Sequence, residues 1–186
     1  EIGAVVNEFQ RTFIVDAMSS FGGIPLNVAE AGIDFLVSSA NKFIEGVPGF
    51  SFVVADRAQL LASGRSARTI SLDLLAQWQG LEESGQFRFT PPTQTILAFR
   101  LALRELDDEG GVPGRANRYA AKHAALLWGM RRQGFREYFP ADLQNHIITI
   151  FLFPDDPNFE FKSFYQRLSD KGMVIYPGKL TEVDYF

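Results

Sequence analysis

The chain has 186 residues, of which 46% are hydrophobic and 22% charged, and its formal net charge is -4. This composition is typical of a packed globular fold, and the even spread of charge argues against nucleic acid or an anionic membrane as a partner. Cysteine is absent, which excludes disulfides, thiolate nucleophiles, Fe–S clusters and cysteine-based zinc sites.

Other residue types and patterns narrow the function further. The only histidines, His123 and His146, are 23 positions apart, and neither an HExxH nor an EF-hand spacing occurs, so we expect no metal cofactor. No apolar run reaches the roughly 18 to 20 residues of a membrane span, and no signal-peptide pattern opens the chain. Cytoplasmic location is therefore the default expectation.

Apolar runs in the first part of the chain predict short buried strands at residues 12–15, 35–37 and 50–55. Glycines and a proline separate the first two runs, with room for one short helix at residues 26–31. Polar residues follow the first two runs directly. This pattern favours an α/β sheet, in which ligands bind beside the carboxyl ends of the strands.

The sequence then turns helical, with predicted helices at residues 71–83, 92–106 and 116–133, the last of them ended by Gly134. Beyond Pro140, the pattern predicts a strand at 147–153, a helix at 161–171 closed by Gly172, and a strand at 173–176. This layout favours a second, smaller α/β domain. We place the division at residues 1–110 and 111–186.

Three polar residues in this layout are candidates for a functional site: Asp16, Lys42 and Thr90. Each also has a purely structural interpretation. An Asp after a strand commonly forms a turn or caps a helix, a loop Lys is usually a solvated charge, and Phe-Thr-Pro-Pro-Thr is an ordinary extended entry to a helix. None of the three predicts a site by itself.

The segments around these residues are more specific when taken in order. They read FIVDAMSSFGGIP at 13–25, SSANKFIEGVPGFSFV at 38–53, SLDLLAQW at 71–78, RFTPPTQTILAF at 88–99 and VIYPGK at 174–179. The set resembles the 2-aminoethylphosphonate:pyruvate transaminases, a branch of the class V aminotransferases. The resemblance implies an α/β fold that forms part of the large domain of a type I pyridoxal-phosphate enzyme, together with part of its small C-terminal α/β domain.

The resemblance implies pyridoxal 5'-phosphate as the cofactor, with Lys42 as the residue that forms the Schiff base and Asp16 as the partner of the ring nitrogen. The chemistry agrees with these roles. An ionised carboxylate keeps the ring nitrogen protonated, so that the ring can accept charge from a developing carbanion. An amine can bind the aldehyde and then move a proton once substrate has displaced it.

Weaker expectations concern the neighbouring residues. Met18, two positions after Asp16, should point to the same side of an extended segment and could pack against the cofactor ring, although core filling is an equal alternative. Ser20 and Asn41 could touch the cofactor or its lysine, or could simply form turns. The resemblance implies that Thr90 contacts the cofactor phosphate of a neighbouring subunit, and therefore a homodimer. Gly22 and Gly23, and the 46–49 turn, should permit close approach of the backbone.

Other parts of the family's site are not found between Glu1 and Phe186. The resemblance implies a phosphate-binding loop and a stacked aromatic residue upstream, and a substrate-clamping Arg-Ile-Gly motif just after the VDYF segment. An arginine fork matches phosphonate or carboxylate geometry. We therefore expect this segment alone to be inactive.

The resemblance thus implies an enzyme that transfers the amino group of 2-aminoethylphosphonate to pyruvate, giving phosphonoacetaldehyde and L-alanine in phosphonate catabolism. One alternative is another class V aminotransferase, for example one acting on alanine or serine with glyoxylate, because the cofactor residues alone do not set the substrate. The other is a non-catalytic α/β binding domain in which Lys42 is a surface charge.

Overall fold

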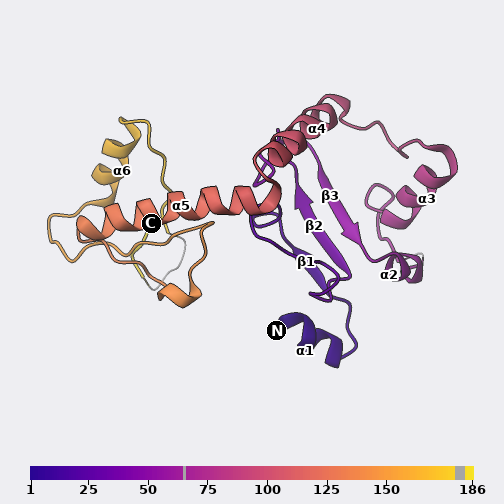
Figure 1. Cartoon of the computed structure of the whole chain (residues 1–186), viewed down its shortest axis with the longest axis horizontal. Coiled ribbons are helices and arrows are strands. Elements are labelled where there is room, and N and C mark those ends of the chain that lie inside the picture. Colours follow the sequence, from indigo (N-terminus) through magenta and orange to yellow (C-terminus); the bar gives the residue numbers. More distant parts are fainter. Residues whose placement is uncertain (65, 179–182) are drawn as a thin grey trace. The chain divides into compact units, whose positions relative to one another are not determined.

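The computed structural model describes residues 1–64, 66–178 and 183–186, so that Lys179, the last residue of the VIYPGK segment, lies outside the described residues. The chain divides into two compact units, Glu1–Ala116 and Asn117–Phe186 (Figure 1). Their assignment to a large cofactor-binding domain and a small C-terminal domain stays a prediction.

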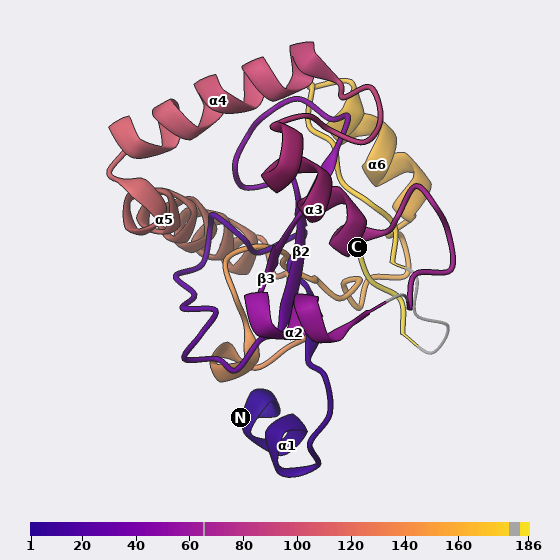
Figure 2. The same ribbon diagram turned by 90° about the vertical axis from the view of Figure 1, so that its right-hand side faces the viewer.

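The first unit is built around a three-stranded sheet of β1 (Ile14–Asp16), β2 (Phe35–Ser39) and β3 (Ser51–Ala55), in that order. β1 and β2 are parallel, with Asp16 opposite Val37, whereas β2 and β3 are antiparallel. The predicted strands are therefore confirmed to within one or two residues at their ends, in a sheet that is mixed. In both Figure 1 and Figure 2, α1 (Ile2–Glu8) lies beyond the amino ends of β1 and β2, and α4 (Thr93–Asp108) beyond their carboxyl ends.

The main apolar core of this unit forms on one face of the central strand. Leu36 is fully buried in β2 and packs with Ala17 and Ile33, and partly buried residues surround this cluster: Phe13, Val15, Phe21, Val28 and Ala31. Burial of these side chains favours the folded state because it removes apolar surface from water.

Leu36→Ala should destabilise the unit strongly. Truncation leaves a cavity in a closely packed core, and we expect a loss of about 2–5 kcal/mol in the free energy of unfolding, measured by urea denaturation of the full-length protein. Leu61→Ala removes the same atoms from an exposed position in α2 (Arg57–Ala62) and serves as the control. Equal unfolding midpoints for the two variants would contradict this account of the core.

The connection from β1 to β2 differs from the prediction, because no helix forms at residues 26–31. The Asn27 side chain accepts hydrogen bonds from the backbone N–H groups of Ala29 (3.2 Å) and Glu30 (3.3 Å), which stabilises turns instead. Gly32 then takes a positive φ of 66°, which reverses the chain before β2. The predicted helix was wrong because local side-chain hydrogen bonds compete with helical ones.

Two short helices in this unit, α1 and α2, were not predicted. They have seven and six residues, too few to show a helical period. α2 begins where the Asp56 side chain accepts a hydrogen bond from the Gln59 N–H at 2.9 Å.

The longer helices were predicted, with shifted ends. α3 (Leu74–Ser84) begins at Leu74 because the Asp73 carboxylate accepts a hydrogen bond from the Ala76 N–H at 2.9 Å. α4 buries Ala102 and Leu106 against Ile44, with Phe21, Phe99 and Val112 around them. α5 (Gly111–Arg132) starts five residues before the predicted 116.

The predicted end of α5 is confirmed. Gly134 has a φ of 87°, and the Phe135 N–H donates to the Met130 carbonyl at 3.1 Å, as in a helix ended by a left-handed residue. Gly172 closes α6 (Phe161–Ser169) with a φ of 76° in the same manner.

The second unit contains a 3-10 helix, η1 (Ala141–Leu143), and α6, but its described residues form no complete strand. The predicted strand at 147–153 is reduced to isolated bridges, Glu137 with Phe151 and Leu152 with Tyr185. The ladder stays short because the extended segment is followed by Pro154, which has no N–H to donate. No strand forms at 173–176 either, where the described residues have no ladder partner.

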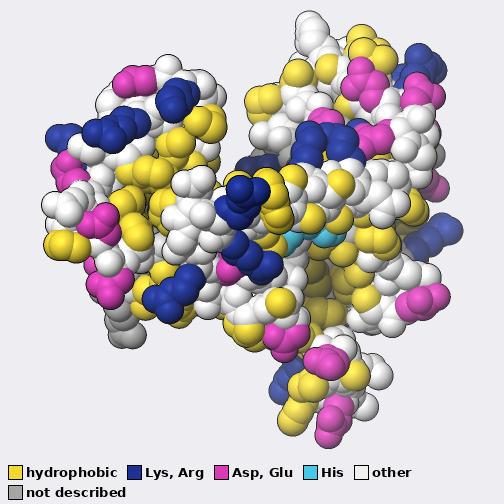
Figure 3. All heavy atoms as spheres, turned by 60° about the vertical axis from the view of Figure 1, so that its left-hand side comes forward, with side chains coloured by type: hydrophobic (Ala, Val, Ile, Leu, Met, Phe, Trp, Pro, Cys, Tyr) yellow, Lys and Arg dark blue, Asp and Glu magenta, His cyan; other side chains and the backbone are white. Residues whose placement is uncertain are grey.

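Aromatic packing takes the place of a larger sheet in this unit. The Phe186 ring lies 5.2 to 6.3 Å from the rings of five other phenylalanines: Phe135, Phe151, Phe153, Phe161 and Phe164. Hydrophobic side chains also remain at the surface, and Figure 3 shows them between charged groups across the face in view.

Candidate active site

Two of the candidate residues, Asp16 and Lys42, lie at the carboxyl ends of neighbouring strands of the sheet. β1 and β2 are parallel, so both strands end on the same side, β1 at Asp16 and β2 at Ser39. Lys42 follows in the turn after β2. The strand order thus brings the Asp16 and Lys42 segments to one edge, as an α/β sheet predicts.

Asp16 is exposed, and one of its carboxylate oxygens accepts a hydrogen bond from the Met18 N–H at 2.9 Å. This contact makes a tight turn, so the strand ends at Asp16 and residues 18–20 leave the sheet. The predicted extended path from Asp16 to Met18 was therefore wrong, because the carboxylate redirects the backbone. Met18 is half-buried, and its contact with a cofactor ring stays a prediction.

Lys42 is exposed, and its amine makes no hydrogen bond or ion pair with the described residues. The backbone around it is well defined. The Glu45 N–H donates to the Lys42 carbonyl at 2.8 Å, and the Gly46 N–H donates to the Ala40 carbonyl at 2.9 Å. We call residues 40–46 the lysine loop. It presents an amine without a protein partner on a closed turn.

The segment after Asp16 packs directly on the lysine loop. A Cβ atom added to Gly23 would lie 2.0 Å from the Phe43 ring, and one added to Gly22 would lie 2.5 Å from Ile44 Cδ1. A Cβ on Gly46 would come within 2.8 Å of the Ala40 carbonyl oxygen. The close approach predicted for these glycines is confirmed, and it fixes the Asp16 and Lys42 segments against each other.

The small polar residues have local partners. Asn41 is exposed, and its side-chain oxygen accepts a hydrogen bond from the Ser39 hydroxyl at 3.0 Å. Ser20 donates weakly to the Ala17 carbonyl at 3.4 Å. Ser39 was not predicted as part of the site, although its position two residues before Asn41 is a recognisable spacing for such a contact. Roles of Ser20 and Asn41 toward a cofactor stay predictions.

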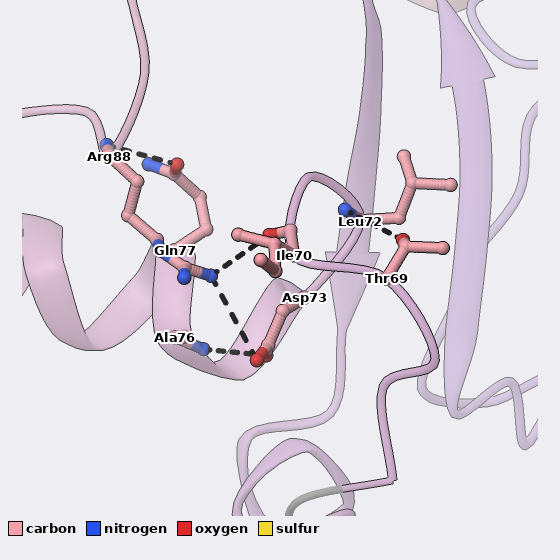
Figure 4. Close-up of polar contacts among 7 residues, drawn as sticks. All are labelled: Thr69, Ile70, Leu72, Asp73, Ala76, Gln77 and Arg88. Atoms are coloured by element: carbon pink, nitrogen blue, oxygen red, sulfur yellow. Dashed lines mark hydrogen bonds and ion pairs between the residues drawn. The ribbon is translucent and has the colours of Figure 1, made fainter.

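Thr90 is exposed in the extended segment between α3 and α4. Arg88, two residues earlier, anchors this segment to the start of α3 (Figure 4). The Arg88 guanidinium donates to the Ile70 carbonyl at 3.2 Å and lies 3.9 Å from the Asp73 carboxylate. The backbone N–H of Arg88 donates to the side-chain oxygen of Gln77 at 3.3 Å. Within the described residues, no hydrogen bond joins Thr90 to Asp16 or Lys42.

Arg115 also touches the lysine loop and was missed by the sequence reasoning. Its side chain is only 2% exposed, and Nη1 donates to the Phe43 carbonyl at 2.5 Å. The two residues are 72 positions apart, and no local pattern signals a contact over that separation.

One titratable group of the second unit has a shifted pKa. Burial lowers the pKa of His123 below its ordinary value, and His146 and Arg131 also lower it, whereas Glu137 raises it. Among the described residues, no group of three or more His, Asp or Glu side chains is arranged to hold a metal ion. No described helix is both long and apolar enough to cross a membrane.

The sequence matches the family model described as aminotransferase class-V over residues 1–179. The chain belongs to the class V aminotransferase family. The predicted resemblance is thereby confirmed. The resemblance to the 2-aminoethylphosphonate:pyruvate transaminase branch is also confirmed. The chain is 50% identical over 187 aligned residues to the 2-aminoethylphosphonate–pyruvate transaminase of Salmonella paratyphi C (strain RKS4594).

Solved structures agree on the fold of this class V aminotransferase chain. Pyridoxamine-pyruvate aminotransferase from Mesorhizobium loti superposes with a TM-score of 0.85 at 23% identity, over 99% of this chain and 48% of that one. Alanine–glyoxylate aminotransferase from Nostoc sp. gives 0.81 at 22% identity, over 99% and 50%. The predicted α/β fold of a type I pyridoxal-phosphate enzyme is confirmed.

The alignment with the Salmonella relative covers 100% of this chain and 51% of that protein. The chain therefore spans about half the length of the curated relatives it matches.

Proposed function

We propose that the full-length protein transfers the amino group of 2-aminoethylphosphonate to pyruvate, with Lys42 and Asp16 as its catalytic residues. The products are phosphonoacetaldehyde and L-alanine. The observation that carries the proposal is the free amine of Lys42, held on a closed turn at the sheet edge where Asp16 also ends its strand. The substrate comes from the 50% identity to a protein named for this reaction.

The class V family implies pyridoxal phosphate as the cofactor, and the side chains at this edge fit it. An amine without a protein partner can bond to an aldehyde, and an exposed carboxylate can accept a hydrogen bond from a ring N–H. When bound, the cofactor supplies an electron sink for the charge that develops on the substrate carbon.

Lys42 has two tasks in this proposal. With the cofactor bound, Lys42 would hold it covalently. The Lys42 Nζ, when free, would also move a proton away from the amine-bearing carbon of the substrate. A general base must reach its proton directly, and the short turn from residue 40 to 46 limits where the Lys42 amine can go.

Asp16 orients the ring and keeps its nitrogen protonated. The hydrogen bond from the Met18 N–H occupies one carboxylate oxygen, Oδ1, and restrains the side chain. No described side chain pairs with the other oxygen, which is available as an acceptor. Met18, Ser20 and Asn41 line the same two turns and complete the proposed cofactor contacts.

We further propose a homodimer in which Thr90 reaches the cofactor phosphate of the neighbouring subunit. Large apolar side chains are exposed around Thr90 and along α4, among them Phe87, Phe89, Leu97 and Leu101. Such a surface is suited to burial in a subunit interface. The cytoplasmic location expected from the sequence stays a prediction.

A mixed dimer tests the role of Thr90. Thr90→Val should lower cofactor affinity by roughly tenfold, the value of about one hydrogen bond to a charged group. When Thr90→Val subunits are mixed with Lys42→Ala subunits at limiting cofactor, activity should return. In each mixed dimer, the site of the Thr90→Val subunit has its own Lys42 and receives Thr90 from the Lys42→Ala subunit. The mixture should exceed the sum of the two separate homodimers. Strictly additive activity, with subunit exchange verified by mass spectrometry, would contradict action across the interface.

Comparison of amino donors tests the substrate. The purified full-length protein should turn over 2-aminoethylphosphonate with pyruvate faster than alanine or serine with glyoxylate. The phosphonate carries a dianionic head group that a carboxylate donor lacks, so the preference should appear in kcat/KM. Equal or better turnover of alanine or serine with glyoxylate would instead assign the protein to that other group of class V aminotransferases.

A further inference from the structure

Arg115 is the most deeply buried charged side chain among the described residues of the first unit, at 2% exposed. Its guanidinium makes three contacts. Nη1 donates to the Phe43 carbonyl at 2.5 Å, and Nε donates to Glu109 Oε2 at 2.7 Å. Nη1 also lies 3.5 Å from Glu45 Oε2.

Two of these contacts end on the lysine loop, on one side of Lys42. Phe43 is the next residue after Lys42, and the Glu45 N–H donates to the Lys42 carbonyl at 2.8 Å. The Phe43 carbonyl and the Glu45 carboxylate therefore tie the loop to Arg115 immediately after the lysine. The third contact, to Glu109, holds the guanidinium itself from the end of α4.

The backbone of the loop shows why such a restraint matters. Glu45 has a φ of 60°, in the left-handed region that a residue with a side chain rarely adopts. A non-glycine residue stays in this conformation only where its surroundings hold it there. The ion pair with Arg115 is such a contact, because it fixes the Glu45 side chain beside a buried charge.

The groups around residue 115 suit an arginine better than a lysine at this position. A buried guanidinium is costly unless its donors are paired, and a planar fork can serve a carbonyl and two carboxylates at once. Lysine offers a point charge on a flexible stem and cannot reproduce this arrangement.

We propose that Arg115 is a positioning residue that holds the lysine loop so that the Lys42 amine stays at the sheet edge beside Asp16. The role of the loop in catalysis rests on the proposed function, whereas its restraint by Arg115 does not. Displacement of a reacting group by about 1 Å can cost roughly 100-fold in rate. Loss of the guanidinium should therefore affect kcat more than KM.

The decisive experiment is hydrogen exchange of the cofactor-free, full-length protein, with wild type and Arg115→Gln compared. Gln is neutral and too short to reach all three partners. We expect at least about tenfold faster exchange of the amides of Glu45 and Gly46, relative to the amides of β2. Arg115→Lys, which retains the charge, should give an intermediate rate.

A second readout uses the cofactor-loaded protein. Arg115→Gln should lower kcat by roughly 10- to 100-fold with a smaller change in KM, and should alter the pH dependence of the bound cofactor's absorbance. Leu60→Ala is the control for general destabilisation. Leu60 is buried in α2 of the same unit, and among the described residues it makes no hydrogen bond with the lysine loop. Its truncation should therefore leave both the exchange ratio and the pH dependence unchanged.

The outcomes separate the two proposals. Unchanged exchange of the lysine loop in folded Arg115→Gln would overturn the positioning role, even with an active wild type. An inactive wild type with a loosened loop in Arg115→Gln would overturn the proposed function and leave the restraint intact. Should Arg115→Gln fail to fold, Glu45→Gln removes the charge of the loop's ion pair with Arg115, and unchanged loop exchange in that variant would overturn the proposal.

Discussion

Lys42→Ala should abolish transamination by the full-length protein, with a loss of at least about 10⁴-fold in kcat. The reason is that one amine holds the cofactor and also moves the proton, and general acid–base catalysis alone contributes up to about that factor. Cofactor can still be held by noncovalent contacts, so the variant should bind it and give a shifted absorbance. Steady-state turnover with 2-aminoethylphosphonate and pyruvate is the measurement.

Two controls make this result specific. Lys162→Ala removes an exposed lysine from α6 and should leave turnover unchanged. Lys42→Arg retains the positive charge but cannot bond covalently to the cofactor at ordinary pH, so it should be as inactive as Lys42→Ala. A Lys42→Ala protein with wild-type turnover would show that Lys42 is only a surface charge.

Asp16→Asn should lower kcat by between about 10-fold and 10³-fold, because an amide cannot stabilise a protonated ring nitrogen. An opposite charge at hydrogen-bond distance shifts a pKa by roughly one to three units, and each unit changes the protonated fraction about tenfold. Loss of the carboxylate lowers the pKa of the ring nitrogen. The deficit should therefore widen as the pH rises and narrow as it falls, which a pH–rate profile measures.

Asp155→Asn is the matched control for this profile, because Asp155 is exposed and makes no hydrogen bond or ion pair with the described residues. Its pH–rate profile should overlay that of the wild type. An Asp16→Asn profile parallel to the wild type at every pH would contradict the role of Asp16 at the ring nitrogen, and would leave it as the turn former that its bond to the Met18 N–H makes it.

Elements with a strong local signal were predicted well from the sequence. β2 and β3 follow from apolar and aromatic runs, and α5 ends where Gly134 allows a left-handed conformation. α1 and α2 were missed because helices of six or seven residues carry no clear period, and α2 depends on the capping hydrogen bond that the Asp56 carboxylate accepts from the Gln59 N–H. The segments at 147–153 and 173–176 have strand-like composition, but a strand also needs hydrogen-bond partners along its length, which composition does not encode.

In the candidate site, too, the features with a local sequence signal were predicted and those that depend on distant contacts were not. Asp16 and Lys42 were expected to meet because parallel strands end at a common edge, and the pairing of β1 with β2 provides that edge. The path after Asp16 was predicted incorrectly, since it depends on where one carboxylate oxygen finds a donor. Arg115 was not predictable, because its contact with Phe43 arises only once α5 has packed on the lysine loop.

Reduction of the cofactor-loaded, full-length protein with borohydride tests the central claim most directly. The reagent makes the link between cofactor and lysine permanent, and peptide mass mapping then identifies the modified residue. We expect a single adduct, on the peptide that contains Lys42, and no adduct in Lys42→Ala. An adduct on a different lysine, or the same adduct retained in Lys42→Ala, would contradict the assignment of Lys42 as the residue that holds the cofactor.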